Sequence, residues 1–273
     1  MHGVLLGKVN EKLDWIGVDP LQQVVSREDA LVAIPWLSIV WQLESPDHGH
    51  FLWWDQQGLH LKSADIDIRS SVHVDFVKGS QARRIKLVAG EALTRAVGCH
   101  KGMRPAIIDA TAGLGGDMSV LANLGCQVLA FERHPLVAAL LQDALRRAEA
   151  AGFDWIDRVR LIYRDAAEVV ASVSHGVIYL DPMFPKERKA SPALSMQVLQ
   201  TLEQTVIDSN RIFEAAMDSN AARIVVKRPL KAEYLGRCAP NSQVKAKTVR
   251  FDLYPKRKLT NYDEISHAEI RGL

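Results

Sequence analysis

The chain has few of the features that mark several protein classes. Only three cysteines occur among its 273 residues, without C-x-x-C spacing, so neither a disulfide framework nor a zinc site is indicated. The longest apolar run, residues 30–41, contains a proline and is too short to span a bilayer. The first residues also lack the basic, apolar and small-residue order of a signal peptide. These absences predict a cytoplasmic, reduced protein with no membrane segment and no metal.

Net charge is small but unevenly distributed. The whole chain carries a formal charge of only +2. Residues 1–77 hold five basic and eleven acidic residues, whereas residues 78–104 hold seven basic residues and one acidic residue. Such a basic segment is typical of a phosphate-contact surface, although a solvated helix face explains it equally well. Within it, Arg83, Arg84 and Lys86 are the candidate RNA contacts.

The hydrophobic pattern divides the chain near residue 80. We expect a small α+β accessory region at 1–77 and a basic linker helix within 78–104. Trp41, Trp53 and Trp54 of the accessory region fit either base stacking or the core of a small sheet. The strands expected in this region lie at 51–54, 59–62 and 72–77, and the linker helix at 80–98.

From residue 105 to residue 273, apolar strands alternate with helices. This order predicts an α/β domain built on a mainly parallel sheet that is flanked by helices. A final strand or hairpin is expected at 244–254. The expected strands are 106–110, 127–131, 159–163, 177–180 and 223–227, and the expected helices are 117–124, 135–150, 166–172 and 195–218.

A glycine-rich turn after the first of these strands indicates a cofactor site. Gly113 and Gly115 open a helix in the way that holds nucleotide-like cofactors at the carboxyl edge of a parallel sheet. A dinucleotide fingerprint needs Gly or Ala where Met118 stands. Asp117 would oppose a pyrophosphate and favours a cationic cofactor such as S-adenosylmethionine. Glu132, 19 residues beyond Gly113, lies where an acid binds ribose hydroxyls.

Each of these two acids also has a plain structural interpretation. Asp117 fits an ordinary acid in the first turn of a helix, and Glu132 fits a solvated strand end. Their joint placement favours the cofactor site.

The second informative segment is Asp-Pro-Met-Phe-Pro at 181–185. An exocyclic amine on a flat ring is a poor nucleophile, and hydrogen-bond acceptors around its hydrogens favour the reactive geometry. Asp181 and the carbonyl of Pro182 are such acceptors on a fixed turn, and Phe184 can stack on the ring. We therefore assign these three residues to catalysis. A plain turn at the end of a strand is the alternative.

Two basic groups are expected at the same edge of the sheet. Lys186, Arg188 and Lys189 follow the second segment, and Lys227 and Arg228 end the strand at 223–227. All five are candidate RNA contacts, and each is compatible with simple solvation.

Several motifs resemble the ribosomal RNA small-subunit methyltransferase J family, over roughly residues 76–254. These motifs are Asp-Ala-Thr-Ala-Gly-Leu-Gly-x-Asp at 109–117, Phe-Glu-Arg-His-Pro at 131–135, Tyr-Leu-Asp-Pro-Met-Phe-Pro at 179–185, Val-Val-Lys-Arg-Pro at 225–229 and Arg-Phe-Asp-Leu-Tyr at 250–254. The resemblance implies a Rossmann-like class I fold. It also implies methyl transfer from S-adenosylmethionine to N2 of a guanine in bacterial 16S rRNA. The partner is therefore expected to be 16S rRNA or the small ribosomal subunit, and the sequence indicates no obligate protein partner.

The resemblance also implies which residues bind the cofactor. Asp165 and Ala166 stand where two small hydroxyl residues are expected, yet an Asp there can accept a hydrogen bond from an adenine amino group. Together with the glycine turn, the expected cofactor-binding residues are Asp109, Gly113, Gly115, Gly116, Asp117, Glu132, Arg133, Asp165, Ala166 and Asp181.

Two other functions fit parts of the pattern. One is methylation of a different amine, such as adenine N6 in DNA or a protein side chain. The other is a dinucleotide-binding oxidoreductase or binding module, against which Met118 and the 181–185 segment argue. Only the family resemblance separates the rRNA guanine from the other amines.

Overall fold

The computed structural model describes residues 3–9, 12–18, 38–42, 49–66, 71–86, 92–172, 176–182, 198–199, 202 and 209–261, with the backbone alone up to residue 42. These residues form two compact units. The first contains Met1–Gly79, His134–Gly152 and Pro185–Val206, and the second contains Ser80–Arg133, Phe153–Phe184 and Ile207–Leu273.

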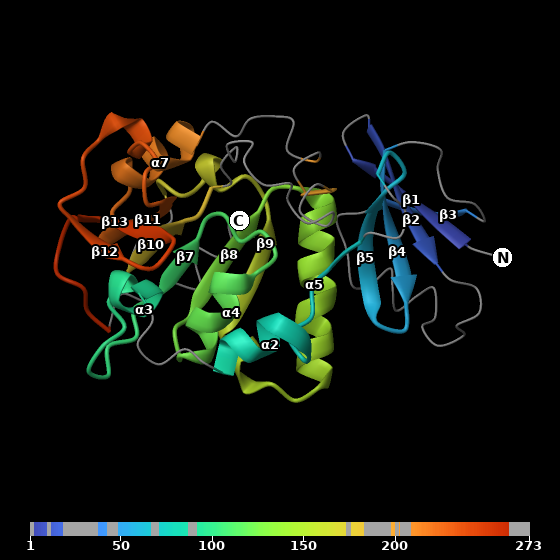
Figure 1. Cartoon of the computed structure of the whole chain (residues 1–273), viewed down its shortest axis with the longest axis horizontal. Helices are drawn as coiled ribbons and strands as arrows, with labels where there is room; N and C mark the ends of the chain where they lie inside the picture. Colours follow the sequence, from blue (N-terminus) through green and yellow to red (C-terminus); the bar gives the residue numbers. More distant parts are fainter. Residues whose placement is uncertain are drawn as a thin grey trace. The chain divides into compact units, whose positions relative to one another are not determined.

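A seven-stranded sheet forms the centre of the second unit, in the order β12-β13-β11-β10-β7-β8-β9 (Figure 1). The five strands β7 to β11 pair in parallel, and β13 is antiparallel to β11 and β12. The order reverses between β7 and β10, and ligands of such sheets bind at the carboxyl ends beside this reversal. The strands are β7 (Ile107–Asp109), β8 (Val128–Glu132), β9 (Val159–Tyr163), β10 (Val177–Leu180), β11 (Arg223–Pro229), β12 (Ser242–Lys245) and β13 (Val249–Pro255).

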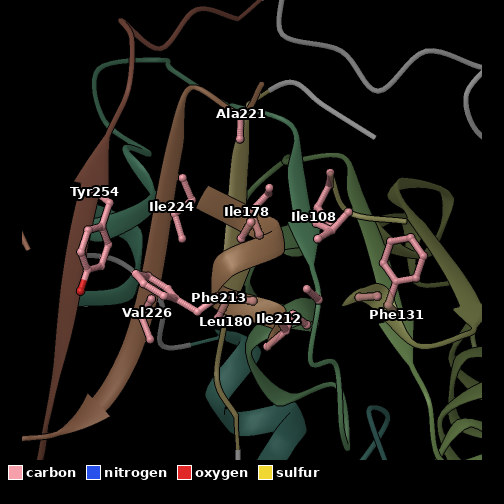
Figure 2. Close-up of a cluster of buried hydrophobic side chains, with 14 of the residues drawn as sticks. Ile108, Phe131, Ile178, Leu180, Ile212, Phe213, Ala221, Ile224, Val226 and Tyr254 are labelled. Carbon is pink, nitrogen blue, oxygen red and sulfur yellow. The ribbon is translucent and has the colours of Figure 1, made fainter. Parts of the chain in front are cut away.

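The central strands are buried along their whole length. Every residue of β7 and β10 is buried, as expected for a parallel sheet that is covered on both faces. Ile108, Ile178 and Ile224 lie side by side on neighbouring strands (Figure 2). Phe213 of α7 (Ser209–Asp218) packs edge-on against Tyr254 of β13, with ring centroids 5.1 Å apart. These contacts pack the central strands against one another and α7 against β13.

The described helices of the second unit are mostly short. They are α2 (Gly79–Lys86), α3 (Ala92–Val97), α4 (Gly116–Asn123), α7 and the 3-10 turns η1 (Asp154–Arg158), η2 (Ala166–Glu168) and η3 (Leu235–Arg237). The helix expected at 166–172 is only the turn η2, which the Asp165 side chain caps by accepting from the Ala167 N–H. Part of the helices expected at 80–98 and 195–218 lies outside the described residues. No described helix has the length and apolar character of a membrane span.

The first unit contains a six-stranded sheet in the order β3-β1-β2-β4-β5-β6. All its pairs are antiparallel except β2 with β4. Strands β1 to β3 were not predicted, because apolar residues there occur in runs without the alternation of a half-buried strand. The strands are β1 (Gly3–Val9), β2 (Lys12–Val18), β3 (Ser38–Gln42), β4 (His50–Asp55), β5 (Gly58–Ser63) and β6 (Val72–His73).

The predicted inward face at residues 72–77 is present, although β6 is short. Val72, Val74 and Phe76 are buried while the residues between them are half-buried. Trp54 is buried, which agrees with a core role. Trp53 is half-buried with the Lys62 Nζ atom 4.3 Å from its ring centroid, and the Trp41 side chain lies outside the described part of the chain.

Helix α5 (Pro135–Ala150) has the predicted bounds and belongs to the first unit, where a buried carboxylate links it to β5. Asp143 accepts from the Leu59 N–H at 3.0 Å and from Arg147 Nε at 2.8 Å. Arg147 also donates to the carbonyl of Val74. Gly58 has φ +113°, and a Cβ there would lie 2.4 Å from a carboxylate oxygen of Asp143. This close approach explains why glycine begins β5.

We expect Asp143→Ala to lower the free energy of unfolding by about 3–5 kcal/mol, because it removes the buried charge partner of the Arg147 guanidinium and the acceptor of the Leu59 N–H. Urea denaturation measures the change. Glu149→Ala, an exposed substitution on the same helix, is the control and should change stability by less than about 0.5 kcal/mol. Equal midpoints for the two variants would contradict this role of Asp143.

Candidate active site

The carboxyl ends of β7, β8, β10 and β11 meet at one edge of the seven-stranded sheet. Asp109 ends β7, Glu132 ends β8, and Asp181 follows β10. The register pairs Leu180 with Val226, so the next residues, Asp181 and Lys227, lie side by side. The predicted site residues of four separate segments are thus brought to the same edge.

Lys227 joins Asp181 to Asp117, a carboxylate in the first turn of α4. Its Nζ donates to Asp117 Oδ2 at 2.8 Å and to Asp181 Oδ2 at 2.7 Å. Asp117 also accepts from the Tyr179 hydroxyl at 2.6 Å and from the guanidinium of Arg84. We call Arg84, Asp117, Tyr179, Asp181 and Lys227 the Asp117 network. It links α2, α4, β10 and β11 through a carboxylate that is 8% exposed.

The charges of the network stabilise one another. Burial alone would raise the pKa of Asp117, but Lys227 and Arg84 together hold it below its usual range. Burial would lower the pKa of Lys227, and the two carboxylates raise it instead. For Asp181, burial is the largest effect and raises the pKa, with Lys227 opposing it. The positive charge of Lys227 therefore offsets the repulsion between the carboxylates of Asp117 and Asp181.

The pKa of Asp109 is shifted in the opposite direction to the pKa of Asp117. Burial raises its pKa to about 8, and the nearby charges of Asp117 and Asp181 add to this, against the Thr111 N–H and Lys227. The side chain is 2% exposed, and one oxygen accepts from the Thr111 N–H at 3.2 Å. At neutral pH this residue is therefore mostly protonated and acts as a structural acid beneath the loop.

The glycine turn forms an open loop between β7 and α4. Gly113 has φ +53°, and a Cβ built there would have only the Thr111 carbonyl within 4 Å, at 3.9 Å. Its N–H donates to Glu132 Oε2 at 2.9 Å, which fixes the loop against the end of β8. Gly115 caps α4 at φ 72°. At Gly116, a Cβ would lie 3.0 Å from the Arg84 guanidinium, so this glycine makes room for the Asp117 network.

The turn after β10 is fixed by a hydroxyl. The Asp181 N–H donates to Thr111 Oγ1 at 2.7 Å, and Pro182 is buried. The Asp181 side chain keeps 36% of its surface exposed. A carboxylate is thereby presented at the sheet edge with its backbone held in place.

The other predicted site residues are distributed as follows. Asp165 caps η2 and pairs with Arg211 at 3.0 Å, Ala166 is buried, and Arg133 is half-buried after β8. Arg83 is exposed on α2, and Lys86 is its last residue. Phe184, Lys186, Arg188 and Lys189 lie outside the described residues.

The positions of Lys227 and Arg228 differ from the prediction that both side chains contact phosphates. Lys227 points into the Asp117 network, as does Arg84. Arg228 is 6% exposed and donates to the carbonyl of Glu233. Successive residues of a strand face opposite sides, so these two cations cannot share one surface.

Comparison with known proteins identifies the family. A family model for SAM-dependent methyltransferases matches residues 37–256. The chain is 40% identical over 225 residues to ribosomal RNA small subunit methyltransferase J of Shewanella oneidensis, covering 79% of this chain and 90% of that protein. With the protein of the same name from Tolumonas auensis, identity is 38% over 245 residues, or 86% and 98% of the two chains. The chain belongs to the ribosomal RNA small subunit methyltransferase J family.

A solved structure supports the same assignment. A SAM-dependent methyltransferase from Neisseria gonorrhoeae is 31% identical, with a TM-score of 0.64 and coverage of 87% of this chain and 94% of that chain. The predicted class I fold, the methyltransferase activity and S-adenosylmethionine as cofactor are confirmed for this member of the methyltransferase J family. Family membership excludes the dinucleotide-binding alternative.

The residues at the sheet edge fit this cofactor. The loop at Gly113 leaves space beside its backbone, where a nucleoside can approach closely. The carboxylates of Glu132, Asp165 and Asp181 suit a ligand with hydroxyl, amino and sulfonium groups, and they would oppose a pyrophosphate. Among the described residues, no group of His, Cys, Asp and Glu is arranged to hold a metal ion.

Two residues of the site were missed from the sequence. Tyr179 and Thr111 lie within the quoted motifs but were given no role. The Tyr179 hydroxyl donates to the Asp117 carboxylate, and Thr111 Oγ1 accepts from the Asp181 N–H. Strand alternation places Tyr179 on the same side as Asp181, two residues on, and this signal was available. The contact of Arg84 with Asp117 joins segments 33 residues apart and has no local signal.

The raised pKa of Asp109 can be tested through the pH dependence of stability. Because its folded pKa is raised from about 3.8 to about 8, ionisation destabilises the fold as pH rises through this interval. We expect the stability difference between wild type and Asp109→Asn to fall with rising pH from 5 to 8, by at most about 1.4 kcal/mol per pH unit. Denaturation at several pH values measures it, and parallel pH profiles would contradict a protonated Asp109.

Proposed function

We propose that this enzyme transfers a methyl group to the exocyclic N2 amine of a guanine in 16S rRNA, free or within the small ribosomal subunit. The observation that carries the proposal is Asp181 at this edge of the sheet: its backbone N–H donates to Thr111, and its carboxylate accepts from Lys227 yet stays partly exposed. The names of the family relatives support rRNA as the substrate. This substrate implies that the enzyme acts in the cytoplasm.

The proposed reaction needs an acceptor for the amine. Bound S-adenosylmethionine supplies a methyl group activated by a positively charged sulfur. The guanine N2 lone pair is delocalised into the ring, so the amine must rehybridise as the new N–C bond forms. The bond from sulfur to the methyl carbon would break at the same time, its electron pair staying on the sulfur of the leaving S-adenosylhomocysteine. Asp181 accepts a hydrogen bond from this amine and stabilises the positive charge that develops on it, and the Pro182 carbonyl is a second acceptor. One amine proton then leaves, and Asp181 is placed to receive it.

The remaining roles follow from position. Phe184, three residues beyond Asp181, is proposed to stack on the flipped base. Asp109, Gly113, Gly115, Gly116, Glu132, Arg133, Asp165 and Ala166 are proposed to form the cofactor pocket, with Glu132 accepting from ribose hydroxyls. Asp117 acts there by holding Lys227 and α4 in place.

Phosphate contacts are proposed for five cations outside the Asp117 network. Arg83 and Lys86 on α2, with Lys186, Arg188 and Lys189 after the catalytic turn, are suitable for this role. We assign Arg84 and Lys227 to the Asp117 network and Arg228 to support of the loop after β11. Residues 78–104 would thus be a basic linker before the catalytic domain, with 1–77 as an accessory region.

Mass spectrometry of 16S rRNA digests tests the proposed function. Cells that lack this gene should lose one N2-methylguanine, and a plasmid carrying the gene should restore it. Methyl transfer to DNA adenine or to a protein, with rRNA unchanged, would favour the alternative amine substrates.

Removal of the Asp181 carboxylate tests the catalytic assignment. Asp181→Ala should slow methyl transfer by about two to three orders of magnitude at saturating cofactor, because the group that stabilises the developing charge is lost. Single-turnover rates with purified RNA measure the effect. Asp154→Ala, which removes a carboxylate that is 86% exposed, is the matched control. Near-normal turnover in Asp181→Ala would place the chemistry elsewhere.

Lys227 should set the pH range of the reaction. Asp181 must be ionised to act, so the rate should rise with pH through its raised pKa. The charged neighbours of Asp181 are Lys227 and Arg84, which lower this pKa, and Asp117, which raises it. Lys227→Met should therefore move the acidic limb of the pH–rate profile to higher pH, and Lys227→Arg should move it less. An unshifted limb in Lys227→Met would leave Lys227 with a structural role alone.

A further inference from the structure

The loop after β11 is held by two buried guanidinium groups. Arg250 Nη1 donates to the carbonyls of Pro229 at 2.9 Å and Leu230 at 2.7 Å, and its Nη2 donates to that of Ala232 at 2.8 Å. Arg228 donates to the carbonyl of Glu233, in the same loop. Four main-chain oxygens of a short loop are thus fixed by side chains that are 4% and 6% exposed.

The charge of Arg250 is balanced within the sheet. Asp252, two residues along β13, accepts from Arg250 Nε at 2.9 Å and from Nη2 at 3.1 Å. Such a buried, multiply bonded guanidinium has a single favourable geometry. The loop conformation is therefore fixed in large part by the hydrogen bonds of Arg250 to its main chain.

The fixed loop displays apolar side chains to solvent. Leu230 is 41% exposed and Tyr234 is 39% exposed, and they are the large exposed hydrophobic residues of the described chain. The guanidinium carbon of Arg250 lies 5.0 Å from the Tyr234 ring centroid, so the ring rests on a cation. An aromatic ring held in this way, with the rest of it accessible, is suited to stacking on a base.

Positive charge surrounds these side chains. Residues 230–247 contain one acidic residue and four basic residues, and all four basic side chains are exposed: Lys231, Arg237, Lys245 and Lys247. The register pairs Pro229 with Val249, so the connection from β12 to β13 lies beside the end of β11. The loop after β11, with Lys231 and Tyr234, and the connection that holds Lys247 therefore lie at the carboxyl end of β11, the sheet edge at which Lys227 and Asp181 also lie.

We propose that this surface, formed by residues 230–234 and Lys247, binds an unpaired segment of the substrate RNA next to the target guanine. Tyr234 stacks on one base, and Lys231 and Lys247 contact phosphates. The inference rests on the proposed function, since it takes the substrate to be RNA. Two apolar side chains among like charges suit a polyanion with flat bases better than an apolar protein partner.

The first experiment compares methyl-transfer kinetics of full-length variants on small subunits isolated from cells that lack the gene. Tyr234→Ala should raise KM for the RNA substrate roughly 5- to 100-fold, because base stacking is lost. Its kcat at saturating RNA and its affinity for S-adenosylmethionine should stay unchanged. Tyr234→Phe keeps the ring and should behave like wild type.

The second experiment measures the salt dependence of RNA binding. Lys231→Ala combined with Lys247→Ala should reduce the slope of log K against log salt by about 1.4, or about 0.7 for each phosphate contact to single-stranded RNA. Lys258→Ala is the matched control, since this exposed lysine follows the opposite end of β13. Its slope should equal that of wild type.

The outcomes distinguish a failure of the proposed RNA-binding surface from a failure of the proposed function. If wild type does not methylate small subunits or 16S rRNA, the proposed function fails. If wild type is active, and if Tyr234→Ala has the KM of wild type and the double lysine variant has its salt slope, the proposed RNA-binding role of this surface is wrong. An effect of Tyr234→Ala on assembled subunits but not on protein-free 16S rRNA would assign the surface to a ribosomal protein and also overturn it.

Discussion

The arrangement of the active site depends on one buried carboxylate, that of Asp117. It lies in the first turn of α4, and it receives Arg84 from α2, Tyr179 from β10 and Lys227 from β11. Removing one partner of such a group leaves an uncompensated charge, so the elements are coupled through it. Lys227 extends the coupling to Asp181, and the acceptor proposed for catalysis is positioned by a residue that need not touch the substrate.

Two aspartates of the same motif show how neighbours decide the state of a carboxyl group. Asp109 and Asp117 are both buried, but only Asp117 has cations and a hydroxyl within hydrogen-bond reach. Asp109 therefore keeps its proton near neutral pH, and Asp117 does not. The loop between them spans a neutral acid at the strand end and an anion at the helix start, which suits the helix dipole.

Much of this architecture could be predicted from local patterns. The five parallel strands, α5 and the C-terminal hairpin follow from hydrophobic periodicity and turn residues, and the edge that carries Glu132 and Asp181 follows from the parallel order. Contacts between distant segments could not be predicted in this way. Arg84 and Lys227 were interpreted as phosphate contacts because their charge was visible in the sequence, whereas their partner, Asp117, lies 33 and 110 residues away. Arg228 shows the same limit, since burial of a cation depends on the partners that the fold supplies.

The way in which Arg250 holds the loop after β11 has an evolutionary consequence. Its hydrogen bonds reach main-chain oxygens, which every amino acid possesses, so they place few demands on the identity of residues 230–234. Outward side chains on such a frame can be exchanged one at a time while the backbone path of the loop and the turn at Asp181 are kept. Enzymes with the same chemistry can in this way diverge in the nucleotides that they recognise, through substitutions in a few consecutive codons.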